Sequence, residues 1–98
     1  MKPYDLTLGF NSRNQFVGFV VEDAGSGAFI GQDGEIQEQD RRESVRIAAT
    51  DGRAAVTFAR AVRLAIQNGK ALRPALIGAS GPFAKPLTGN SNVAARAG

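Results

Sequence analysis

Arginine and phenylalanine are the residue types through which this sequence could do binding chemistry. The chain contains 12 Lys and Arg residues together and six Phe residues. A guanidinium group neutralises phosphates, and a flat aromatic ring is a surface on which a nucleobase stacks. Whether the two types can act together depends on the elements that carry them.

The first arginine group comprises Arg41, Arg42 and Arg46, just before and within a predicted strand. Arg42 and Arg46 share a face if the strand extends back that far, because side chains alternate along a strand. The group has two interpretations. It clamps backbone phosphates, or it pairs in a solvated loop with the neighbouring acids Glu38, Asp40 and Glu43.

The second group lies on a predicted helix, where Arg53, Arg60 and Arg63 form a basic stripe. No acid lies four residues away to neutralise the stripe. A phosphate-binding role is therefore open, beside the alternative of an ordinary solvated helix face. Arg13 stands apart from both groups, at the predicted tip of a hairpin.

Four phenylalanines lie on the predicted sheet. Phe16 and Phe19 have opposite parity in the sequence and should point to opposite faces, so one of them should lie away from the core. That ring is either a platform for base stacking or a contact between subunits. The four are Phe10, Phe16, Phe19 and Phe29.

The sequence offers little for catalysis. It contains no Cys and no His, so a thiolate, an imidazole general base and the usual zinc ligands are missing. Ser44 and Ser80 would need activation by Lys or a carboxylate, and the lysines lie in predicted ends or loops. The acids do not match a calcium loop, and the Gly-rich segments 25–27 and 31–34 lack the lysine of a phosphate loop. We expect a protein that is not an enzyme and takes no metal, cofactor or small-molecule substrate.

The apolar pattern predicts an antiparallel sheet. A hairpin is predicted near the amino end. Apolar and polar residues alternate over residues 4–10, turn formers follow at 11–14, and a run rich in β-branched and aromatic residues comes next. Asp33-Gly34 is a tight-turn signal, which leaves open whether the third strand is one strand or two. The predicted strands span residues 4–10, 15–22, 28–31 and 44–49, with a further strand segment at 35–38.

One amphipathic helix is predicted over residues 51–68, so the fold class is α+β, a curved four- to five-stranded sheet followed by this helix. Thr50-Asp51-Gly52 offers side chains that can cap its start, and Asn68-Gly69 can end it. Residues 71–77 contain a proline and predict an edge strand or an extended arm. We expect one domain over residues 1–77 and an extended or disordered Gly/Pro/Asn-rich tail over 78–98. The apolar face of the helix comprises Ala54, Ala55, Phe58, Ala61, Val62, Ala65 and Ile66.

Charge is unevenly distributed along the 98-residue chain, whose net charge is +3. Residues 1–40 carry two Lys/Arg against seven Asp/Glu, whereas residues 41–98 carry ten against two. Such asymmetry indicates a polyanionic partner, or complementarity within or between subunits. No apolar run approaches the roughly 20 residues that span a bilayer, and the amino end lacks the apolar core of a signal peptide. We expect no membrane association and a cytoplasmic location in a bacterial or phage-infected cell.

A resemblance to known folds rests on two segments, YDLTLGFNSRNQFVGFVVED (residues 4–23) and SVRIAATDGRAAVTFARAVRLAIQNG (residues 44–69). Their order resembles the unit of four strands and a helix in the PUR, whirly and coactivator-type single-stranded DNA-binding folds. The resemblance covers residues 4–68 and implies a symmetric dimer that binds single strands on sheet surfaces. In length and composition the chain is also similar to the small single-stranded DNA-binding proteins of filamentous phages. The acidic first half departs from the pattern.

These observations predict a homodimeric protein that binds single-stranded DNA or RNA with little sequence preference and is encoded by a phage or mobile element. Bases would stack on Phe16 or Phe19. The alternative is a protein-binding adaptor or inhibitor whose acidic first forty residues form a docking face or mimic nucleic acid. A third interpretation, duplex-DNA regulation, would need a second helix beside a recognition helix. The cations assigned to phosphates are Arg13, Arg41, Arg42, Arg46, Arg53, Arg60 and Arg63.

Overall fold

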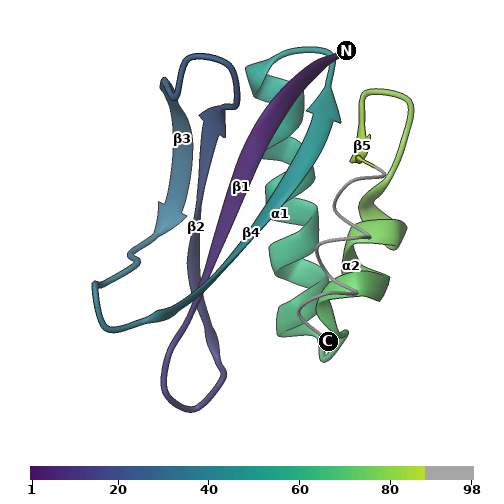
Figure 1. The fold of residues 1–98 in the computed structure, drawn as a ribbon. Coiled ribbons are helices and arrows are strands. Elements are labelled where there is room, and N and C mark those ends of the chain that lie inside the picture. The colour runs from purple at the N-terminus through teal and green to yellow at the C-terminus, as the bar shows by residue number, and fades with distance from the viewer. Residues whose placement is uncertain (88–98) are drawn as a thin grey trace.

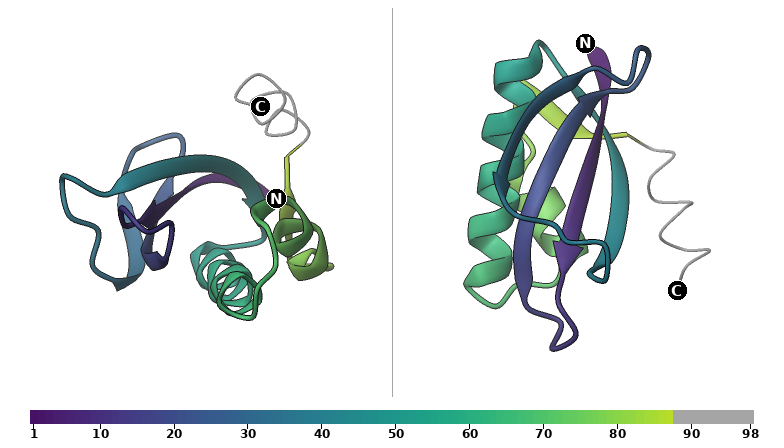
Figure 2. Two further views of the ribbon diagram at one scale, coloured as in Figure 1. Left: turned by 90° about the horizontal axis from the view of Figure 1, so that it is seen from below. Right: turned by 90° about the vertical axis from the view of Figure 1, so that its left-hand side faces the viewer.

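The fold is a five-stranded antiparallel sheet with two helices on one face (Figure 1). The computed structural model describes residues 1–87. The sheet order is β3-β2-β1-β4-β5, and both helices lie on the concave side of the curved sheet (Figure 2). The predicted α+β class is confirmed, with a second helix and a fifth strand added. In chain order the elements are β1 (Lys2–Phe10), β2 (Phe16–Asp23), β3 (Phe29–Gly34), β4 (Arg41–Ala49), α1 (Gly52–Gln67), α2 (Leu72–Ala79) and β5 (Ala84–Pro86).

The central strand β1 organises the core. Its alternation places Tyr4, Leu6, Leu8 and Phe10 on the side of the helices, and all four are buried. The buried layer extends to the two strands that pair with β1. Leu8 pairs with Phe19 of β2, and Tyr4 pairs with Ile47 of β4, so the side chains of each pair lie on the same face. The rest of the buried sheet layer comprises Val21, Val45, Ile47 and Ala49.

The connection from β3 to β4 has to pass both β2 and β1, because β4 pairs with the first strand. Gly9 and Gly18 pair across β1 and β2 on the outer face, opposite the helices. A Cβ on Gly9 would lie 2.7 Å from Cγ1 of Ile36, so the connecting segment 35–40 packs directly on this glycine. Two adjacent residues without side chains thus leave room for the crossing.

Residues 29–34 form β3, so the third strand is a single strand. The further strand segment predicted at residues 35–38 is wrong, because these residues form no strand and lie in the connection to β4. Gly34 pairs with Gly18 and ends the strand with a positive φ of 72°. The Asp-Gly pair therefore marks the point where the chain leaves the sheet edge and begins its crossing.

Helix α1 confirms the predicted helix almost to the residue. Asp51 caps it through a hydrogen bond of 2.8 Å from the Ala54 N–H to its Oδ1. The predicted apolar face differs at two positions, because Ala59 is buried and Ala61 is exposed. The buried stripe is therefore turned slightly from the one expected, since α2 covers one flank of α1 beside the sheet.

The prediction of an edge strand or extended arm over residues 71–77 is wrong, because these residues enter helix α2. Pro74 is tolerated since it lies in the first turn, where the backbone N–H has no partner within the helix. The next two residues, Ala75 and Leu76, are buried in the core. Of the predicted tail, residues 84–86 pair with β4 as β5, and residues 88–98 lie outside the described residues.

Candidate nucleic-acid interface

The two helices form a layer without acidic residues. We call residues 52–80 the helix layer, and they contain five Lys/Arg and no Asp/Glu. Residues 1–51 carry five Lys/Arg and nine Asp/Glu. Because the helices lie on one side of the sheet, the charge asymmetry of the chain becomes an asymmetry between two layers of the molecule (Figure 2). The cations of the helix layer are Arg53, Arg60, Arg63, Lys70 and Arg73.

Arg53 and Arg60 remain on the solvent side of α1. Both are exposed, and neither has an ion pair or side-chain hydrogen bond with any of residues 1–87. Their spacing of seven residues corresponds to about 10 Å along the helix axis. Both guanidinium groups are therefore held on a rigid element and have no partner among the described residues.

Arg63, the third member of the predicted stripe, is used inside the fold. Its Nη1 lies 2.8 Å from Oδ1 of Asp33 on β3, and the arginine side chain is 25% exposed. Its guanidinium also lies 5.9 Å from the ring centre of Phe16. Arg63 thus ties α1 to the edge of the sheet and is less available to a phosphate than its two neighbours on the helix.

Arg41 lies on the concave face at the start of β4, in a cluster with aromatic and polar groups. Its guanidinium lies 4.5 Å from the ring centre of Phe10, 3.1 Å from Oε1 of Glu43 and 2.6 Å from Oδ1 of Asn14. Arg41 therefore pairs with a neighbouring acid, Glu43, as the second interpretation of this group expected.

Arg42 and Arg46 share the outer face of the sheet, as the strand pattern predicts, because β4 begins at Arg41. Arg42 donates to the carbonyl oxygen of Gln37 at 3.2 Å. Arg46 Nε donates to Oδ1 of Asp5 at 2.9 Å, and this hydrogen bond and the carboxylate charge raise the pKa of Arg46. The acids on the same sheet offset much of the attraction of this face for a polyanion.

Arg13 lies at the tip of the β1–β2 hairpin, as predicted. It is exposed, and its backbone N–H donates to Oδ1 of Asn11 at 2.9 Å. Its guanidinium has no ion pair with any of residues 1–87.

Both predicted stacking rings lie on the helix side of the sheet, so the prediction that one points away from the core is wrong. Gly9 pairs with Gly18 but Phe10 pairs with Phe16, which makes Val17 an extra residue in a β-bulge. The bulge reverses the parity between the two phenylalanines. Phe19 is 0% exposed and has no surface to offer a base, and Phe16 is half-buried with its ring edge-to-face against Phe10 at 5.4 Å.

Two other phenylalanines are exposed. Phe29, on the edge strand β3, is 61% exposed and pairs with an acid of β2, Glu22. Phe83, in the loop before β5, is 66% exposed and lies beside the helix layer. Phe83 falls within the predicted tail of residues 78–98. The Gly81-Pro82 pair before it is a turn signal that indicates the loop holding it.

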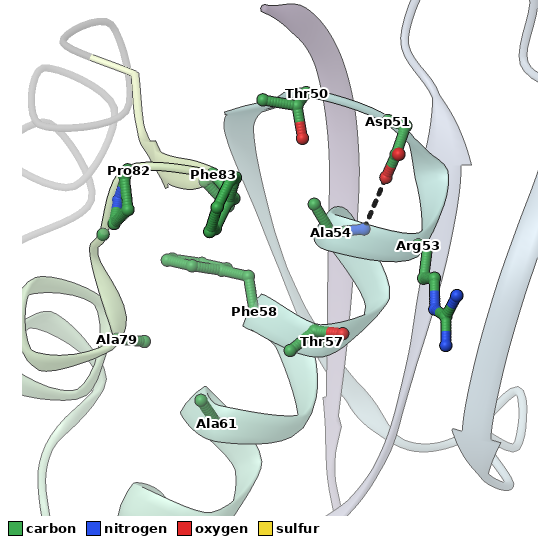
Figure 3. A pocket seen from close by; sticks show the side chains of 12 residues that line it. Thr50, Asp51, Arg53, Ala54, Thr57, Phe58, Ala61, Ala79, Pro82 and Phe83 are labelled. Atoms are coloured by element: carbon green, nitrogen blue, oxygen red, sulfur yellow. Dashed lines mark hydrogen bonds between the residues drawn. The ribbon is translucent and has the colours of Figure 1, made fainter.

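Phe83 lines an open hollow of about 370 Å³ between α1 and the loop that joins α2 to β5 (Figure 3). Figure 3 shows Phe83 and Phe58, both of which line the hollow, on one side, with Arg53 projecting from the other side of α1. The lining is mainly apolar, with Thr50, Thr57 and the capping Asp51 at its edge. Its other members are Ala54, Ala61, Ala79, Gly81, Pro82 and Ala84.

No protein-family model, curated protein or solved structure matches the chain. Neither helix within residues 1–87 is long and apolar enough to cross a membrane. In the same range no three acidic side chains converge in a group that could hold a metal ion.

Proposed function

We propose that the protein binds single-stranded nucleic acid with little sequence preference, and that the helix layer is its binding face. The observation that carries the proposal is the set of cations on residues 52–80, which no acid of the same layer neutralises. Among them, only Arg63 has an ion pair with any of residues 1–87. A surface of this kind attracts a polyanion and gains affinity from the counterions that the polyanion releases.

The mechanism is neutralisation of phosphates by exposed guanidinium and ammonium groups. Arg53 and Arg60 are about two helical turns apart on α1, and Lys70 and Arg73 extend the basic surface to the start of α2. Contacts with phosphates carry no direct sequence information. Binding through these residues would therefore tolerate most sequences.

The binding face is then on the helices and not on the sheet, where the resemblance to the PUR and whirly folds would place it. Those families and the filamentous-phage proteins remain the basis for expecting a single strand and a homodimer in the cytoplasm of a bacterial or infected cell. The outer face of the sheet is less suited because Asp5 pairs there with Arg46.

The test compares two double variants that remove the same charge from different faces. The first variant, Arg53→Gln with Arg60→Gln, removes the two arginines of α1 that have no ion pair among the described residues. The second, Arg13→Gln with Arg42→Gln, removes two exposed arginines from the hairpin tip and the outer sheet face. Affinity for labelled oligothymidine is measured by fluorescence anisotropy over a range of salt concentrations. We expect the α1 variant to reduce the slope of log K against log salt by roughly 1.4, since each phosphate contact on a single strand contributes about 0.7. The matched variant should leave the slope nearly unchanged.

The opposite pattern would place the interface on the hairpin and sheet and reject the helix layer. A duplex of the same length is run in parallel, because the second helix α2 removes one objection to duplex binding. Tighter binding to the duplex would reject the preference for single strands.

Absence of binding at low salt would favour the alternative, an acidic docking face. That face would use Glu35 and Glu38 on the crossing segment 35–40, which have no cation partner among residues 1–87. Its partner would be a basic protein surface.

A further inference from the structure

We propose that the hollow beside α1 holds one base of the bound strand, stacked on Phe83, while the phosphates of the strand cross α1 past Arg53 and Arg60. This inference rests on the proposed function and adds to it the position and the chemistry of a base-binding site.

The size and lining of the hollow suit a flat, partly polar group. Its volume of about 370 Å³ falls within the range of small-molecule pockets. Phe58 is 3% exposed and forms part of its wall, whereas the ring of Phe83 is open to solvent. Aromatic rings of this kind stack on any base, because every base has a π-face.

The loop that carries Phe83 is held in place by its backbone. The Thr50 N–H donates to the Phe83 carbonyl oxygen at 2.9 Å, and the Gly81 N–H donates to the Ala84 carbonyl oxygen at 2.9 Å. Ala84 itself is buried in the core. The exposed ring is therefore presented by an ordered loop, so that binding a base costs little ordering of the chain.

The polar groups at the edge of the hollow fit a base better than an apolar side chain. The hydroxyl groups of Thr50 and Thr57 make no hydrogen bond with any of residues 1–87, so they can donate to or accept from a base edge. Asp51 is the only acid in the lining, and its Oδ1 already accepts the Ala54 N–H.

Charge identifies the occupant as a nucleic acid. All charged residues of the helix that forms one wall of the hollow are arginines. One of them, Arg53, lies both in the lining and on the exposed basic face. A strand that places a base on Phe83 can therefore place its adjacent phosphates over α1. The other exposed phenylalanine, Phe29, lies beside an acid, because it pairs with Glu22 of the neighbouring strand β2.

Tryptophan fluorescence provides the first test, since the chain contains no Trp. Phe83→Trp and Phe29→Trp each introduce a single tryptophan at an exposed phenylalanine position. On addition of oligothymidine at low salt, we expect base stacking to quench the fluorescence of the Phe83 variant and to leave that of the Phe29 variant nearly unchanged. Quenching at Phe29 alone would place base contacts on the sheet edge and overturn the inference.

The second test separates the base site from phosphate binding. Phe83→Leu should weaken oligothymidine binding roughly five- to 150-fold, the range expected for one stacked base, and should leave the salt slope unchanged because no charge is lost. With an abasic oligomer of the same length, Phe83→Leu should have no effect. If the wild type binds oligothymidine with the expected salt slope but Phe83→Leu binds equally well, the base site is wrong and the proposed function stands. If the wild type does not bind at all, the proposed function itself fails.

A change in molecular mass of the Phe83→Leu variant on gel filtration, without a change in oligothymidine affinity, would identify the hollow as a contact between subunits and overturn the inference.

Discussion

At the residue scale, identical side chains have different roles because of what lies opposite them. Arg60 and Arg63 are three residues apart on α1, but Asp33 of β3 lies within 2.8 Å of Arg63 and no acid among residues 1–87 pairs with Arg60. The first is therefore a ligand-binding candidate and the second an internal link between helix and sheet. Phe83 and Phe19 differ in the same way, since a stacking ring must be exposed and Phe19 is not.

Asp23 gives a prediction about pH at this scale. Hydrogen bonds from the backbone N–H groups of Ser26 and Gly25, with the charge of Lys2, lower the pKa of Asp23 below its ordinary value of 3.8. A carboxyl whose pKa is lower in the folded state stabilises the fold above the unfolded value, and this stabilisation is lost as the pH falls through the folded value. Urea unfolding should show the wild type more stable than Asp23→Asn at neutral pH, with the difference shrinking as the pH falls below 3.8. A difference that stayed constant over this range would mean that the carboxylate charge does not stabilise the turn.

At the element scale, the crossing segment 35–40 and the bulge at Val17 determine which faces the strands present. The crossing depends on glycines at 9, 18 and 34, where the chain passes close to other backbone or side-chain atoms. The bulge turns Phe16 towards Phe10 and Arg63, and it removes the stacking platform that simple alternation predicts on the outer face.

Two glycines with similar backbone angles test the role of the crossing. Gly27 and Gly34 have φ angles of 74° and 72°, but an added Cβ has open space at Gly27 and would clash with the carbonyl oxygen of Val17 at Gly34. Gly27→Ala should lower the free energy of unfolding by about 1–2 kcal/mol, the cost of a left-handed backbone for a residue with a Cβ. Gly34→Ala should cost clearly more, because β2 and the crossing chain must also move. Equal losses in urea denaturation would show that the close approach at Gly34 is relieved without cost.

At the scale of the whole molecule, the sheet side and the helix side carry opposite net charge. Residues 1–51 have four more acids than bases, and the helix layer has five bases and no acid. This separation supports attraction of a polyanion to one side, and it also allows the acidic side of one copy to meet the basic side of another.

The oligomeric state should therefore depend on salt. We expect light scattering after gel filtration to give a mass above that of the monomer at low salt and the monomer mass at high salt, since contacts between exposed charges weaken as salt screens them. Excess oligothymidine should also dissociate this assembly, because it competes for the helix layer. A monomer at every salt concentration would reject the homodimer, and a dimer that resists salt would indicate an apolar contact, such as one at the edge strand β3 and Phe29.

The sequence by itself determined the features that depend on neighbours along the chain. The alternation from Tyr4 to Phe10 marks a strand with one buried face, and the Asp51 cap with Asn68-Gly69 marks both ends of α1. The absence of acids from residues 52–80 is likewise visible in the sequence alone. Only the tertiary structure decided the bulge at Val17, the pairing of Arg63 with Asp33 and the exposure of Phe83. Each of these depends on strand register and on contacts between residues far apart in the chain, and the periodicity of a local segment carries no information about them.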